Sequence, residues 1–165
     1  MENDNEETFS TTEGSTILKT EPQTFRSWLH RAPKLFPQTE RGSWRRLTKD
    51  NLLAIRIMQV LMAKGIELED AADVVADAYF IKDLPKGYVQ GARVSMSDDS
   101  VALVLDFDPT EKIIEKRLLS VAGCQKHVST NLFNAGTVSQ TFINIVQIKC
   151  ELQERIWAFQ KAEKE

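Results

Sequence analysis

The sequence predicts a mainly α-helical protein with small β elements, and three observations lead to this prediction. Apolar side chains recur mostly at steps of three and four residues, which is the spacing of a helix with one buried face. Turn-forming residues separate these segments from short runs of strand-forming residues. The chain has 165 residues, 42% of them hydrophobic, which is enough to bury a real core.

Two short helices are expected near the N-terminus, after a disordered acidic tail over residues 1–8. The first helix is expected over about Thr12–Leu18. The second is predicted to begin at Thr20, which can form a capping box with Gln23, and to end before Pro33 because proline cannot continue a helix. The second helix carries an apolar stripe of Phe25, Trp28 and Leu29, flanked by Arg26 and Arg31.

A turn-rich stretch over residues 37–43 follows the second helix and separates two short apolar segments. These segments, Leu35–Phe36 and Trp44–Leu47, are expected to pair as a small antiparallel ribbon. Two helices joined by a tight turn and followed by such a ribbon are the parts of a winged helix-turn-helix, in which the ribbon is the wing. The sequence therefore predicts a winged helix-turn-helix in the N-terminal half.

Two longer helices complete the predicted N-terminal domain, which is expected to span residues 9–83. Thr48 is expected to cap a strongly apolar helix that ends at Gly65, because glycine is common just past a helix end. The next helix is expected over about Glu67–Tyr79, with acidic residues in its first turn, where they interact favourably with the helix dipole.

The remaining residues, 84–165, are expected to form an α+β segment that serves in dimerisation or regulation. A linker over residues 84–87 is predicted to open it. The elements predicted after the linker are two strands that form a hairpin, an amphipathic helix, a polar irregular stretch and a final amphipathic helix, over residues 88–96, 101–107, 110–121, 123–140 and 141–161. The final helix is expected either to form a coiled coil with a second chain or to pack on its own hairpin.

The basic residues are concentrated in one part of the chain, although the formal net charge is −3. Residues 22–66 hold nine Lys and Arg against two acidic residues, a net charge of +7, whereas residues 1–21 and 67–165 each have a net charge of −5. A basic block of this kind suits phosphate binding, because Lys and Arg displace the cations condensed on nucleic acid. A solvated charged face is the alternative interpretation.

The segment over residues 18–29 resembles a motif of the MerR-type winged-helix transcription regulators. It follows their pattern Leu-Gly-Val-Ser-Pro-x-Thr-Leu-Arg-Tyr-Tyr-Glu without a gap, and it is identical to the pattern at Pro22, Thr24 and Arg26. Lys19 replaces the glycine of the family's first turn, a change expected to alter the angle between the first two helices.

Two further segments resemble the same family in the same order. Residues 43–52 resemble the wing and third helix, Gly-Tyr-Arg-x-Tyr-Ser-x-x-Asp-Leu. Residues 56–70 resemble the pattern Arg-x-x-x-x-Leu-x-x-x-Gly-x-Ser-Leu-x-Glu. The resemblance covers about residues 9–76, which is under half of the chain. The family's metal-binding cysteine loop is not recognisable, so no effector ligand is implied.

The resemblance implies that the second helix enters the major groove of double-stranded DNA, where base edges display distinguishable donors and acceptors. Gln23, Arg26 and Ser27, near the start of this helix, are expected to face bases. Arg commonly pairs with guanine, and Gln with adenine. Others on this helix and at the wing are expected to contact the phosphate backbone. The full set of candidate DNA-binding residues is Gln23, Thr24, Arg26, Ser27, Arg31, Arg41, Arg45, Arg46 and Lys49.

The leading hypothesis is therefore a cytoplasmic, nucleoid-associated transcription regulator that binds an inverted repeat as a homodimer through the segment after residue 84. One alternative is an architectural protein similar to the excisionases that direct recombination. A second alternative is a winged-helix module that binds proteins. An enzyme is not expected, because no catalytic constellation is present and no cofactor motif accompanies the basic block.

Metal binding and membrane insertion are not expected either. Cys124 and His127 supply two metal ligands where a zinc site needs three or four, and Cys150 is distant in the sequence. With only two cysteines, the chain has no disulfide framework. No apolar run approaches the roughly 20 residues that a membrane span requires.

Overall fold

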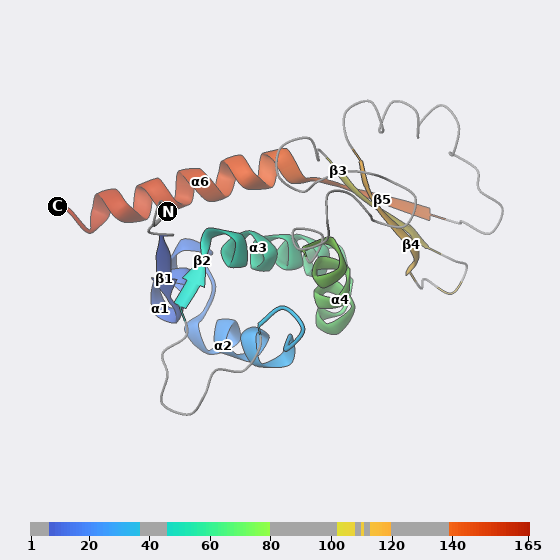
Figure 1. The fold of residues 1–165 in the computed structure, drawn as a ribbon, viewed down its shortest axis with the longest axis horizontal. Coiled ribbons are helices and arrows are strands. Elements are labelled where there is room, and N and C mark those ends of the chain that lie inside the picture. The colour runs from blue at the N-terminus through green and yellow to red at the C-terminus, as the bar shows by residue number, and fades with distance from the viewer. Residues whose placement is uncertain (1–6, 37–45, 80–101, 108–109, 111–112, 120–138) are drawn as a thin grey trace, which may run out of the picture. The chain divides into compact units, whose positions relative to one another are not determined.

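The computed structural model describes residues 7–36, 46–79, 102–107, 110, 113–119 and 139–165 (Figure 1). Two compact units are present: the first is Met1–Ala76 together with Ile148–Glu165, and the second is Asp77–Gln147. The predicted fold class is confirmed, because helices predominate and the strands form small antiparallel pairings. Within the described ranges, no helix is long and apolar enough to cross a membrane.

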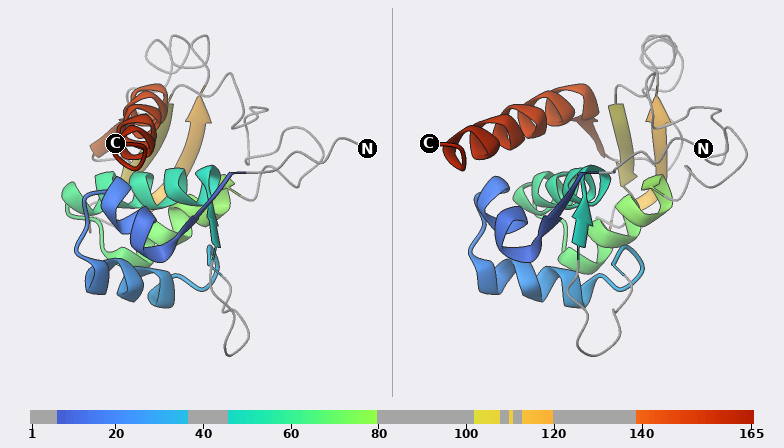
Figure 2. Two further views of the ribbon diagram at one scale, coloured as in Figure 1. Left: turned by 90° about the vertical axis from the view of Figure 1, so that its left-hand side faces the viewer. Right: turned by 60° about the vertical axis from the view of Figure 1, so that its left-hand side comes forward.

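The first unit is built mainly from helices around one core. Its elements are β1 (Thr8–Ser10), α1 (Thr11–Ile17), α2 (Pro22–Arg31), β2 (Arg46–Thr48), α3 (Lys49–Ala63), most of α4 (Leu68–Tyr79) and most of α6 (Ile145–Ala162). The apolar α3 contributes the largest share of fully buried side chains, including Leu52, Ile55, Met58 and Leu61. In Figures 1 and 2, α3 lies between α2 and α6.

The strand β2 pairs with β1, so the predicted pairing of the wing is wrong. Phe9 lies opposite Leu47 in this antiparallel pair, and both side chains are buried. Leu35 and Phe36 instead extend the turn at the end of α2, where both backbone N–H groups donate to the carbonyl of Ala32. The turn buries both side chains, and this tertiary burial outweighs their strand-like local pattern.

A capping box joins β1 directly to α1. The Ser10 hydroxyl accepts from the backbone N–H of Glu13 (3.2 Å), and the Glu13 carboxylate accepts from the backbone N–H of Ser10 (2.5 Å). Two donors at the helix start are thereby satisfied. Thr8 belongs to β1, so ordered structure begins inside the range expected for the acidic tail, of which residues 1–6 lie outside the described residues.

The capping box predicted for the start of α2 is wrong. The N-cap residue is Glu21, which makes no side-chain capping bond, and Pro22 is the first helical residue. The Thr20 hydroxyl lies one residue too early and is engaged elsewhere: it donates to the carbonyl of Leu18 (3.3 Å) and accepts from the Gln59 side-chain amide (2.7 Å). This contact to α3 could not be recognised in the local sequence.

Both ends of α3 are as predicted. Thr48 is its N-cap, with a hydroxyl that accepts from the backbone N–H of Asn51 (3.2 Å). Gly65 lies just past its end with a φ of +89°, a conformation that glycine adopts without steric cost. The N–H groups of Gly65 and Ile66 donate to the carbonyls of Met62 (2.9 Å) and Leu61 (3.3 Å), which makes a Schellman motif.

The turn between α1 and α2 contains a residue in the left-handed region. Lys19 has a φ of +52°, and it is the residue that replaces the family's glycine. Its N–H donates to the carbonyl of Thr16 (3.1 Å), and the N–H of Thr20 donates to that of Ser15 (2.9 Å). The turn thus keeps the glycine-type conformation although lysine is strained there.

Replacing Lys19 with glycine is expected to raise the free energy of unfolding by about 0.5 kcal/mol, because relief of left-handed strain exceeds the entropy that glycine loses on folding. Urea titration followed by circular dichroism measures this change. Gly65→Ala is the reverse control and should lower stability by about 1 kcal/mol, since alanine is strained at positive φ. A loss of stability in Lys19→Gly would show that the lysine side chain contributes more than its backbone conformation costs.

The second unit contains a three-stranded antiparallel sheet with the order β4-β3-β5. The strands are β3 (Ala102–Phe107), β4 (Ile113–Leu119) and β5 (Ser139–Asn144). The central strand is buried from Ala102 to Asp106. Asp106, with a relative exposure of 1%, accepts a hydrogen bond from the Gln140 side-chain amide (2.8 Å) on β5.

Three sequence-based assignments in this region are corrected. Residues 113–119 form a strand where an amphipathic helix over 110–121 is predicted, and residues 141–144 belong to β5 where the final helix is predicted to start. Both edges of β3 pair with these strands, so its partner is not the segment 88–96, which itself lies outside the described residues. A buried central strand needs hydrogen-bonded neighbours on both edges, and this requirement overrides local helical periodicity.

The final helix, α6, carries the predicted apolar stripe, and Ile148, Leu152 and Ile156 are buried. From Ile148 onward it belongs to the first unit, whereas the expected division places it in the segment 84–165. Hydrogen bonds from α6 to α3 and to the end of α1 accompany this burial. The expected coiled coil with a second chain stays a prediction.

Candidate nucleic-acid interface

The helix α2 has one buried side and one exposed side. Phe25 has a relative exposure of 0% and Leu29 is also buried, so these two residues anchor α2 to the core. Gln23, Arg26 and Ser27 are exposed and follow a spacing of three and four residues, which places them on one face. We call these three residues the exposed face of α2.

Close packing of α1 fixes the position of α2. A Cβ atom added to Gly14 would lie 2.9 Å from Leu47 Cδ1, 3.1 Å from Phe25 Cζ and 3.2 Å from Leu52 Cδ2. These distances are shorter than ordinary carbon contacts, so the absence of a side chain at Gly14 lets α1 approach α2, β2 and α3. The exposed face of α2 is therefore presented from a tightly packed support.

The C-terminal end of α2 is bound to α4 by ion pairs. Arg31 Nη2 lies 2.5 Å from Glu69 Oε1, and Lys34 Nζ lies 2.7 Å from Asp73 Oδ1. The hydrogen bond from Arg31 holds the pKa of Glu69 below its usual value. Both pairs are exposed, and exposed pairs of this kind contribute little net stability. Arg31 can therefore exchange Glu69 for a phosphate at small cost.

Arg46 and Lys49 lie at the β1–β2 ribbon, close to acidic residues. Lys49 Nζ is 2.8 Å from Glu7 Oε2. Arg46 lies opposite Ser10 in the ribbon, and its charge adds to the Ser10 hydrogen bonds that lower the pKa of Glu13. The structure thus places Arg46 and Lys49 at the β1–β2 ribbon, each near an acidic residue.

The structure separates the nine predicted DNA-binding residues into groups. Five are exposed on α2: Gln23, Thr24, Arg26, Ser27 and Arg31. Arg46 and Lys49 are exposed at the ribbon. Arg41 and Arg45 lie outside the described residues.

Two further exposed residues, one on α2 and one at its N-cap, extend this surface. His30 follows Arg26 and Ser27 by four and three residues, so it continues the exposed face, and Glu21 precedes the first helical turn. A carboxylate can accept a hydrogen bond from cytosine N4 in the major groove. The helical spacing alone would have identified His30. Trp28, which is predicted to belong to the apolar stripe, is only half-buried.

The chemistry of the exposed face suits base recognition more than catalysis or metal binding. It combines a guanidinium group, an amide and a hydroxyl on a helix narrow enough for the major groove. In the part of the chain that the structure describes, no three His, Cys, Asp or Glu side chains are grouped to hold a metal ion.

Residues 9–78 match a family model described as MerR HTH family regulatory protein. The matched segment runs from β1 into α4 and includes the whole of α2. Among curated proteins, no sequence matches the chain. The N-terminal part is therefore a MerR-type helix-turn-helix domain, as the sequence motifs predict. This domain supports a DNA-binding transcription regulator.

Proposed function

We propose that this DNA-binding transcription regulator recognises an inverted repeat as a homodimer, with the exposed face of α2 in the major groove. One observation carries the proposal. Gln23, Arg26 and Ser27 stand exposed on the first turns of α2, while Phe25 in the same turns is buried and anchors the helix. A rigidly held helix with polar side chains near its N-terminus has the geometry of a recognition helix.

The proposed roles follow from the chemistry of each side chain. Arg26 and Gln23 can each make two hydrogen bonds to one base, with guanine and adenine respectively as the best partners. Ser27 can serve as a donor or an acceptor. Thr24 and Arg31 lie beside the exposed face, where they would contact phosphate oxygens and fix the register of the helix.

The basic residues of the ribbon are proposed to contact the DNA backbone beside the major groove. Arg46 and Lys49 are exposed at its base, and Arg41 and Arg45 belong to the same stretch of sequence. Lys49 is paired with Glu7, and a phosphate would have to displace this carboxylate. Such contacts would add affinity that depends on salt concentration but not on base sequence.

A homodimer is proposed because one winged helix covers little DNA. A single module buries about 600–1,000 Å² of protein surface, near the lower limit for specific binding. Two copies related by a two-fold axis would double this surface on an inverted repeat. We propose the segment after residue 84 as the dimer interface and the nucleoid in the cytoplasm as the site of action.

The test begins with selection of bound duplexes from a random pool, followed by affinity measurement through fluorescence anisotropy. We expect an inverted repeat with half-sites about 10 base pairs apart, or a multiple of that distance. Inserting about five base pairs between the half-sites turns one of them to the opposite side of the duplex and should weaken binding by about 100-fold or more.

One control duplex and one measurement of stoichiometry test the dimer on an inverted repeat further. An insertion of about ten base pairs restores the helical phase and should recover part of the lost affinity. Sedimentation of the complex should give two chains per duplex. Selection of arrays of direct repeats would contradict the dimer on an inverted repeat and favour an architectural protein instead.

A further inference from the structure

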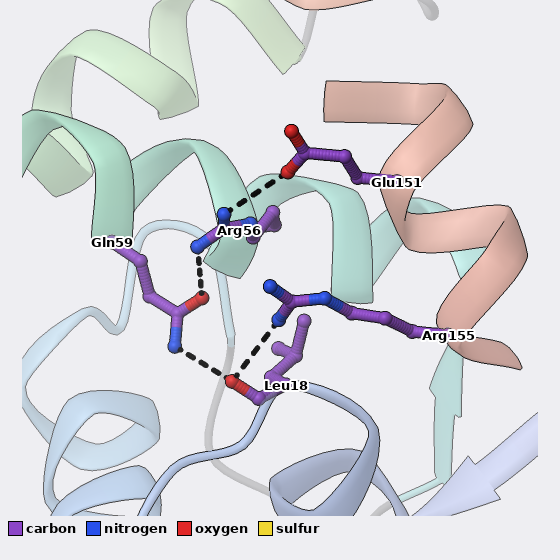
Figure 3. A network of polar contacts seen from close by, with 5 residues as sticks. All are labelled: Leu18, Arg56, Gln59, Glu151 and Arg155. Atoms are coloured by element: carbon purple, nitrogen blue, oxygen red, sulfur yellow. Dashed lines mark hydrogen bonds and ion pairs between the residues drawn. The ribbon is translucent and has the colours of Figure 1, made fainter. Parts of the chain in front are cut away.

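The carbonyl of Leu18, at the turn between α1 and α2, is a meeting point for three elements of the first unit (Figure 3). It accepts hydrogen bonds from Gln59 Nε2 on α3 (3.2 Å) and from Arg155 Nη1 on α6 (3.5 Å). The hydroxyl of Thr20, two residues along the same turn, donates to it as well (3.3 Å). Helix α6 therefore contacts the turn that precedes the recognition helix.

A second connection runs from α6 to the same turn through α3. Glu151 Oε2 on α6 lies 3.2 Å from Arg56 Nη2, and Arg56 Nη1 donates to Gln59 Oε1 (3.2 Å). Gln59 Nε2 in turn donates to Thr20 Oγ1 (2.7 Å). Glu151 thus orients Arg56, and Arg56 orients the amide that holds the turn (Figure 3).

This cluster has an unfavourable electrostatic side. Burial lowers the pKa of Arg155, and the neighbouring Arg56 lowers it further, while Glu151 partly compensates. The Nε atom of Arg56 is buried without a hydrogen-bond partner among the described residues. Two half-buried arginines beside one carboxylate are expected to add little net stability to the packing of α6, since removing charges from water costs free energy even when they are paired.

The start of α2 depends on this turn. Its N-cap residue, Glu21, makes no side-chain capping bond, so no local cap fixes the first helical turn. That first turn carries Gln23 and is followed at once by Arg26. A binding site must be held to within about half an ångström by residues behind it. The contacts at Leu18 and Thr20 are placed to provide that support.

We propose that Glu151 and Arg155 of α6 are positioning residues for DNA recognition. They hold the turn at residues 18–20 so that α2 presents its exposed face in the geometry that bases require. This inference rests on the proposed function, because it assigns α6 a role in the same recognition site. Neither residue contacts DNA itself in this mechanism.

The test uses the full chain with Arg155→Met and Glu151→Gln. Each variant has a matched control on the solvent-exposed side of α6 with the same change of charge: Lys161→Met for the arginine and Glu154→Gln for the glutamate. Arg155→Lys retains a donor and should partly restore the wild-type behaviour. Comparing each variant with its control separates the effect of losing a charge at this position from the effect of changing the net charge of the protein.

The first measurement is backbone amide hydrogen exchange without DNA. In Arg155→Met and Glu151→Gln, the amides of Thr20 and Phe25 should exchange about 5-fold faster or more, because the turn opens locally. The amide of Gly65, bonded at the far end of α3, should keep its rate. Unchanged exchange at Thr20 and Phe25 would overturn the positioning role. An equal rise at Gly65 would also overturn it, because the loss would then be one of global stability.

The second measurement is affinity for the selected duplex as a function of salt. We expect Kd to rise about 5- to 20-fold in both variants, with an unchanged slope against salt because no phosphate contact is lost. A slope reduced by about one per subunit in Arg155→Met would show direct phosphate contact and overturn the inference. If the wild-type chain bound no duplex, the proposed function would fail, a result distinct from unchanged exchange in the variants.

Discussion

Replacing Arg26 with alanine is expected to weaken binding to the selected inverted repeat by about 2–6 kcal/mol. The loss of a side chain that pairs with one base costs about 1–3 kcal/mol, and a dimer loses it in both half-sites. Arg26 is exposed and adjacent to Phe25, which is fully buried, so its side chain can be removed without disturbing the core. Anisotropy titration against the selected duplex and against base-substituted duplexes measures the effect.

Two variants control for charge. Arg26→Lys keeps the positive charge but loses the two-pronged contact, so specificity should fall while the salt dependence stays near that of the wild type. Lys64→Ala removes one positive charge at the exposed end of α3 and should change affinity little. If Arg26→Ala weakened binding to every duplex equally, Arg26 would be a backbone contact and its assignment to a base would be wrong.

The largest effect on stability is expected at Phe25. Phe25→Ala should lower the free energy of unfolding by about 3–5 kcal/mol, because it removes a buried ring and leaves a cavity. The ring has no exposed surface, and a Cβ atom added at Gly14 would lie 3.1 Å from its Cζ, so the ring lies where α1 approaches α2. The midpoint of urea unfolding should fall accordingly.

Phe25→Leu and Arg26→Ala are the controls for this prediction. Leucine fills part of the cavity and should cost less than alanine, whereas the exposed Arg26→Ala should alter stability by about 0.5 kcal/mol or less. Equal destabilisation by Phe25→Ala and Arg26→Ala would contradict the packing described around α1 and α2.

Features set by neighbouring residues were predicted correctly from the sequence. Thr48 caps α3, Gly65 ends it in the left-handed region, and Phe25 and Leu29 form the buried side of α2. Each depends on bonds or contacts within one helical turn, or on a side-chain period that the sequence displays directly. The exposed face of α2 follows from the same period, so the candidate site on this helix could be foreseen.

Features that depend on distant partners were predicted wrongly or only in part. Leu35 and Phe36 resemble a strand, yet the core beneath α2 buries them in a turn. Residues 113–119 have a helix-like apolar spacing, yet they become a strand because β3 needs a partner at each edge. The hydrogen bond from Arg155 to the Leu18 carbonyl joins residues far apart in the chain, and no local sequence pattern predicts it.

The sequence by itself determined a MerR-type helix-turn-helix domain, its basic charge and the side chains that α2 exposes, because helix periods, caps and motif spacing are local properties. The tertiary structure decided which strands pair, where α6 lies within the first unit and what supports the turn before α2. These outcomes depend on competition among surfaces far apart in the chain. The outcome depends on burial and hydrogen bonding in the assembled core, and these cannot be predicted from any single segment alone.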